Sequence, residues 1–99
     1  MTRADLYKLH TELCEKAYTL LRLKNQDYAP KDDNPFSNFD RKGLEGITTR
    51  MGDKLARLEA FAERGTFRLE TETVEDTVLD MINYAVLFYG YIENKKPKS

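Results

Sequence analysis

The stretch that most constrains the fold is residues 73–92, the most apolar part of the sequence. Its apolar side chains recur at helical spacing and predict an amphipathic helix. On that helix Asp76, Asp80 and Asn83 are four and three residues apart and therefore form one polar line. A carboxylate within an apolar surface is unfavourable unless it is paired, protonated or bound to a metal. We therefore expect these polar side chains to have a partner elsewhere in the chain.

Two earlier segments have the same helical pattern. From Ala4 to about Leu23, leucine and alanine recur at helical spacing, with charged residues on the opposite side. A second amphipathic pattern begins at Leu44 and is expected to end at Gly65, because glycine readily adopts the left-handed conformation of a helix cap. Since no segment has the pattern of a strand, we expect an all-α fold, a compact bundle of three main helices.

The third helix has a predicted start and end. Thr73 and Asp76 have the spacing of a capping box, so Asp76 is either a helix cap or a metal ligand. The helix is expected to run to about Glu93, followed by a disordered basic tail at residues 94–99. A chain of 99 residues is expected to form a single domain, 1–99, with its core at about 4–93.

A polar segment from Lys24 to Phe39 separates the first two helices. Its prolines and Asx residues favour turns, and we expect an ordered loop of about 15 to 20 residues that contains at most a short helical turn. Loops of this length are often functional. Tyr28, Phe36 and Phe39 are able either to anchor the loop or to stack on a ligand. Lys24 and Asp27, at its start, are able to contact a base and a phosphate; alternatively, Lys24 complements the helix dipole.

Composition excludes several classes of protein. The 16 basic and 17 acidic residues give no strong positive field, which argues against binding of long nucleic acids.

Cys14 is the single cysteine and, from its helical position, is expected to be a small core residue rather than a reactive thiol. No apolar run approaches the about 20 residues of a membrane span, so we expect a cytoplasmic protein that does not bind membranes. A short chain buries a modest core, and a homo-oligomer is expected to complete it.

The second predicted helix carries a charged stripe. Arg50, Lys54 and Arg57 align on one side with Asp53 beside them, a set suited to phosphate and to a divalent cation. Alternatively, this side is a solvated face with an ion pair between Asp53 and Arg57, and Asp80 makes a structural ion pair with one of the three cations. Mg²⁺ prefers carboxylate oxygens. The residues predicted to hold Mg²⁺ are Asp53, Asp76 and Asp80.

The order of four short motifs resembles the nucleotide-modification-associated helical domain family of bacteriophages. The motifs are Lys24-Asn-Gln-Asp-Tyr28, Asn34-Pro-Phe-Ser-Asn-Phe39, Arg50-Met-Gly-Asp-Lys54 with Arg57, and Glu75-Asp-Thr-Val-Leu-Asp80 with Asn83-Tyr-Ala85. The resemblance covers roughly residues 8–92. It implies phage origin, a location in the host cytoplasm, a role in nucleotide metabolism, and ligand contacts from motif residues that include Asn38 and Asn83.

A more distant similarity concerns mechanism. Glu75-Asp76-x-x-x-Asp80 is similar to the acidic motif of the all-α nucleoside triphosphate pyrophosphatases, the superfamily of dimeric dUTPases and house-cleaning nucleotide hydrolases. That similarity implies Mg²⁺ bound by Asp76 and Asp80, both also catalytic, and hydrolysis between the α and β phosphates. This chain departs from the superfamily because its second helix offers Asp53 alone where the superfamily has a Glu-x-x-Glu pair.

Three functions follow from these observations. The first is a nucleotide-binding protein, with or without Mg²⁺-dependent pyrophosphohydrolase activity, in which Arg50, Lys54 and Arg57 hold phosphates and the loop aromatics hold the base. The second is a sponge without catalytic activity that sequesters a host nucleotide immune signal. The third is a helical inhibitor of a host protein. Which nucleotide is bound, and whether it is turned over, stay open at this point.

Overall fold

The computed structural model describes residues 1–28, 33–39, 41–66 and 72–97. For residues 26–28 it describes the backbone and not the side chains. Its elements are α1 (Arg3–Tyr28), the short 3-10 helix η1 (Ser37–Phe39), α2 (Leu44–Arg64) and α3 (Val74–Lys95). Within these ranges there is no strand, and the predicted all-α fold of three main helices is confirmed. None of the described helices is both long and apolar enough to cross a bilayer.

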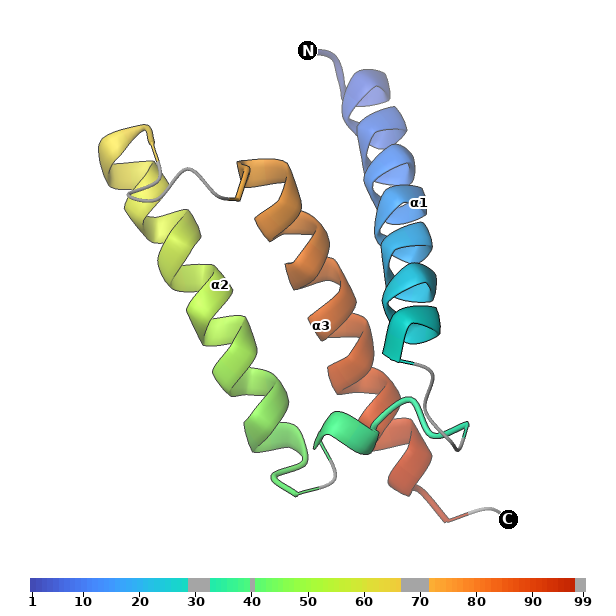
Figure 1. Ribbon diagram of the computed structural model, residues 1–99. Coiled ribbons are helices and arrows are strands. Elements are labelled where there is room, and N and C mark those ends of the chain that lie inside the picture. Colours follow the sequence, from blue (N-terminus) through green and yellow to red (C-terminus); the bar gives the residue numbers. More distant parts are fainter. Residues whose placement is uncertain (29–32, 40, 67–71, 98–99) are drawn as a thin grey trace.

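Helix α3 lies between the other two long helices (Figure 1). It packs against α2 on one side and α1 on another, and η1 packs against α2. In the described residues, no Cα atom of α1 comes within 8 Å of a Cα atom of α2. Among the described elements, α3 is the one long helix that packs against two other long helices, which agrees with its having the most apolar sequence.

Two of the predicted helix ends are confirmed in detail. Thr73 and Asp76 form the capping box: the Asp76 backbone N–H donates to Thr73 Oγ1 at 3.0 Å, and the Thr73 N–H donates to Asp76 Oδ2 at 3.2 Å. Helix α2 ends at Gly65, whose φ of 74° is left-handed and whose N–H donates to the Phe61 carbonyl at 2.7 Å. Both ends satisfy backbone groups that a helix terminus leaves without partners.

Two predicted boundaries were wrong. Helix α1 continues to Tyr28, so Lys24 and Asp27 lie in its last turns rather than at the start of a loop. No proline or glycine stands between residues 24 and 28 to stop the helix. Helix α3 continues to Lys95, and the predicted disorder at residues 98 and 99 lies outside the described residues.

The buried core is small for a chain of this length. The described residues that are both apolar and buried are Ala17, Phe36, Phe39, Ile47 and Leu79. Ile47 and Thr77 are the largest side chains that are fully buried. Several large apolar side chains are instead exposed, among them Tyr18 on α1 and Tyr89 on α3. The helices therefore cover each other over a limited area.

The turn between η1 and α2 depends on a glycine that has no room for a side chain. Gly43 has a φ of 58°, and a Cβ atom at this position would lie 2.8 Å from Tyr91 Oη. We expect Gly43→Ala to lower the free energy of unfolding by about 2 kcal/mol, because it adds a steric contact with Tyr91 to the strain of a backbone conformation, φ 58° and ψ −133°, that residues with a side chain rarely adopt. Chemical denaturation of the purified variant measures this change.

Gly65→Ala is the matched control for this substitution. Gly65 also has a positive φ, 74°, but no atom lies within 4 Å of the place that a Cβ would take there. Only the backbone strain remains, and the expected loss is about 1 kcal/mol. The two glycines also differ in ψ, −133° at Gly43 and 6° at Gly65, so equal losses would show that neither this difference nor the contact with Tyr91 adds to the effect of a side chain at Gly43.

Candidate functional site

The three long helices are joined at one carboxylate. Asp80, two turns into α3, accepts a hydrogen bond from Lys54 of α2, with Nζ 2.8 Å from Oδ2. Its other oxygen, Oδ1, lies 3.2 Å from Nζ of Lys24 on α1. The side chains of Asp80 and Lys54 are only 13% and 17% exposed, so this ion pair is shielded from water. Of the partners that the sequence left open for Asp80, the structure supplies Lys54 and adds Lys24.

A second carboxylate, from Glu72, extends this group of charges. Glu72 Oε1 lies 3.1 Å from Lys54 Nζ and 3.0 Å from Thr77 Oγ1, which donates to it. Glu72 Oε2 lies 2.9 Å from Nη1 of Arg57. Glu72 precedes the Thr73 cap and belongs to no motif, so no signal in the sequence pointed to it. We call Lys24, Lys54, Arg57, Glu72 and Asp80 the charge cluster.

The charge cluster holds Asp80 and Lys54 in their ionised forms. Burial by itself would raise the pKa of the Asp80 carboxyl, but the hydrogen bonds from Lys54 and Lys24 outweigh burial, and the pKa lies below its ordinary value. Burial would likewise lower the pKa of Lys54, but hydrogen bonds to Asp80 and Glu72 raise it above its ordinary value. At neutral pH the pair is therefore charged on both sides.

The carboxylates predicted to bind Mg²⁺ lie in different settings. Asp76 is occupied in the capping box, and Asp53 is exposed on α2. Among the described residues, no three or more His, Cys, Asp and Glu side chains gather where they could hold a metal ion. The structure thus does not bring Asp53, Asp76 and Asp80 together as one acidic group, and these donors do not match the set that the similarity implies. The Mg²⁺ site stays a prediction.

The loop aromatics anchor the loop. Phe36 is buried and meets the ring of Tyr91 edge to face, with centroids 5.5 Å apart and planes at 84°. Phe39 is also buried, and the guanidinium of Arg50 lies 5.9 Å from its ring centroid. Of the two roles that the sequence left open for these rings, their contacts with α2 and α3 support anchoring. Asn38 is exposed in η1.

The remaining predicted residues have separate positions. Asn83 is buried, and its Nδ2 donates to the Ala17 carbonyl at 3.0 Å, which ties α3 to α1. It is therefore a structural contact in this chain, near the charge cluster but bonded away from it. The side chains of Asp27 and Tyr28 lie outside the described residues, so their predicted ligand contacts stay predictions.

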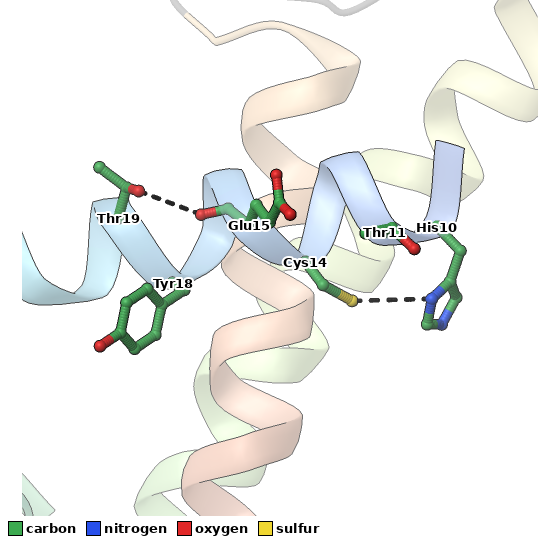
Figure 2. A pocket seen from close by; sticks show the side chains of 6 residues that line it. All are labelled: His10, Thr11, Cys14, Glu15, Tyr18 and Thr19. Carbon is green, nitrogen blue, oxygen red and sulfur yellow. Dashed lines mark hydrogen bonds between the residues drawn. The ribbon is translucent and has the colours of Figure 1, made fainter. Parts of the chain in front are cut away.

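A shallow hollow on α1 is separate from the charge cluster. Figure 2 shows that its six lining side chains all come from one helix. Cys14 lies there, exposed, with Sγ 3.9 Å from Nδ1 of His10. The prediction that Cys14 is a core residue was wrong, because the helix turns this side away from α3, against which Ala17 is buried.

Comparison with known proteins adds no relative. Protein-family models, curated proteins and solved structures give no match to this chain. The phage-family resemblance and the similarity to pyrophosphatases therefore stay predictions.

Proposed function

We propose that this chain is a nucleotide-binding protein whose charge cluster holds the phosphate groups of the ligand. The observation that carries the proposal is the convergence of Lys24, Lys54 and Arg57, from two helices, on the two carboxylates of Glu72 and Asp80. Three cations against two acids leave the cluster with a surplus of positive charge. Lysine and arginine are the side chains that proteins use for phosphate, through charge-assisted hydrogen bonds.

The exposure of the cations supports a ligand entering from solvent. The side chains of Lys24 and Arg57 are 49% and 46% exposed, whereas Lys54 between them is 17% exposed. A phosphate group would therefore meet Lys24 and Arg57 first, with N–H groups that still face water. Lys54 would serve mainly to hold Asp80 and Glu72 in place beneath them.

The same contacts support binding without turnover. Both carboxylates of the cluster are already engaged by cations, Asp80 by two lysines and Glu72 by Lys54 and Arg57. A divalent cation bound to either carboxylate would lie next to these cations and be repelled by them. We therefore propose that the nucleotide is held and released unchanged, as expected of a sponge, and that hydrolysis is the alternative outcome of the test.

The test is a thermal-shift and calorimetric screen of nucleoside mono-, di- and triphosphates and cyclic dinucleotides, each with and without Mg²⁺. A ligand at a hundredfold excess over its dissociation constant stabilises the folded protein by about 2.7 kcal/mol. After binding, the protein is denatured and the released compound is analysed by chromatography. Unchanged ligand supports binding alone, whereas a shortened phosphate chain identifies hydrolysis.

Variants connect the binding to the cluster. Lys24→Gln and Arg57→Gln are each expected to weaken nucleotide binding about tenfold, the loss of one charge-assisted hydrogen bond. The matched control is Lys96→Gln, because Lys96 is an exposed lysine that pairs with Glu93 at the other end of α3. No binding of any compound in the screen, or an equal loss in the Lys96 variant, would contradict the proposal.

A further inference from the structure

Helix α1 is attached to the described chain through one neighbour. Among the described elements it packs against α3 alone, on the side of α3 away from α2 (Figure 1). Of the α1 side chains that the structure describes, only Ala17 is buried. The other buried apolar residues all belong to segments that follow α1, and they are Phe36, Phe39, Ile47 and Leu79. Helix α1 therefore contributes little of its own surface to the core.

Two exposed ion pairs fasten α1 to α3. Lys16 Nζ lies 2.6 Å from Oε1 of Glu75, and Lys24 Nζ lies 3.2 Å from Oδ1 of Asp80. The two lysine side chains are 59% and 49% exposed. Ion pairs this open to water are weak, and dissolved salt screens them. We call Lys16 and Lys24 the latch lysines.

Separation of α1 from α3 would leave no buried charge without a partner. Asp80 would keep Lys54, whose Nζ lies 2.8 Å from its Oδ2. The latch lysines already face water and would become fully hydrated. Asn83 would lose its hydrogen bond to the Ala17 carbonyl, but water would reach its amide once α1 has left. The polar contacts between α1 and α3 can therefore be exchanged for contacts with water.

The contact between α2 and α3 has a different character. It includes the pair of Lys54 and Asp80, which are 17% and 13% exposed, and salt screens such a shielded pair much less. Ile47 on α2 is 0% exposed, and Phe36 packs edge to face on Tyr91 of α3. Because buried apolar surface is the main source of folding stability, we expect η1, α2 and α3 to stay together where α1 does not.

We infer that α1 leaves α3 and returns as one unit while η1, α2 and α3 stay folded, and that the latch lysines set how often it leaves. Most of the stability of a helix in a protein comes from tertiary packing, so α1 loses its backbone hydrogen bonds during each departure. Lys24 belongs to the charge cluster, and undocking of α1 therefore removes one of its three cations. The effect of this removal on nucleotide binding rests on the proposed function, whereas the undocking itself does not.

Hydrogen–deuterium exchange of the full chain, without nucleotide, tests the inference. The α1 amides on both sides of Ala17 are expected to exchange at one shared rate, about 100-fold faster than the α3 amides around Leu79. Raising the salt concentration from about 0.01 M to about 1 M shortens the Debye length from about 30 Å to about 3 Å. We expect this change to speed the exchange of α1 about tenfold and to leave that of α3 nearly unchanged.

Variants identify the latch. Lys16→Gln and Lys24→Gln are each expected to speed the exchange of α1 about threefold, the effect of losing one exposed ion pair. In the double variant, salt should have little further effect on α1. The matched control is Lys96→Gln, because Lys96 pairs with Glu93 three residues earlier in the chain and its loss should leave α1 unchanged. An α1 exchange rate equal to that of α3, or latch variants that exchange like the wild type, overturns the inference.

Discussion

Asp80→Ala is expected to lower the free energy of unfolding by about 3 kcal/mol, because removing one partner of a shielded ion pair leaves an uncompensated charge. Asp80 is the only described residue whose carboxylate meets both Lys24 of α1 and Lys54 of α2. Lys54 keeps Glu72, which places the expected loss at the lower end of the range for buried pairs. Urea denaturation followed by circular dichroism measures the change.

Asp76→Ala serves as the control for Asp80→Ala. Asp76 lies on the same line of α3 but is exposed, and it contributes the return bond of the capping box. Its loss is expected to lower the free energy of unfolding by about 1 kcal/mol. A loss at Asp80 no larger than the loss at Asp76 would show that the charge cluster does little to hold the three helices together.

The contribution of Asp80 should also depend on pH in a definite direction. Because its folded pKa lies below the ordinary 3.8, its stabilisation is present above that value and is lost as the pH falls through the lowered folded pKa. Lys54 has a pKa raised above 10.5, so its contribution is present below that value and is lost as the pH rises through the raised folded pKa. The difference in stability between wild type and Asp80→Ala should therefore stay level across neutral pH and shrink in strong acid. A difference that persists in strong acid would point to packing rather than charge.

Ile47→Ala is expected to lower the free energy of unfolding by about 3 to 4 kcal/mol. Ile47 is 0% exposed in the first turn of α2, and its truncation removes buried apolar surface and leaves a cavity. Few apolar residues of the described chain are buried, so few remain to compensate. The same urea denaturation measures the loss, and Ile47→Val should show about 1 kcal/mol.

Leu55→Ala is the matched control for Ile47→Ala. Leu55 lies on the same helix but is 48% exposed, and its truncation should change the free energy of unfolding by less than about 1 kcal/mol. Similar losses at Ile47 and Leu55 would mean that the interior of the single chain is not where its stability lies.

Part of the candidate site could be predicted from the sequence. The line of Asp76, Asp80 and Asn83 follows from helical geometry, and all three side chains do have partners in the structure. The identity of those partners could not be predicted. Glu72, outside any motif, pairs with Lys54, while Asn83 bonds to a backbone carbonyl of α1. Which charges meet is decided by how far apart the helices pack, and no periodicity within one helix reports that distance.

The sequence by itself determined the features that depend on neighbours along the chain. The three helices, the capping box at Thr73 and the left-handed end at Gly65 all follow from local hydrogen bonding and from backbone sterics. Only the tertiary structure decided that Cys14 faces solvent, that Phe36 and Phe39 are buried, and that three cations converge on two carboxylates. These outcomes depend on contacts between residues far apart in the chain, since Lys24 and Asp80 lie 56 positions from each other.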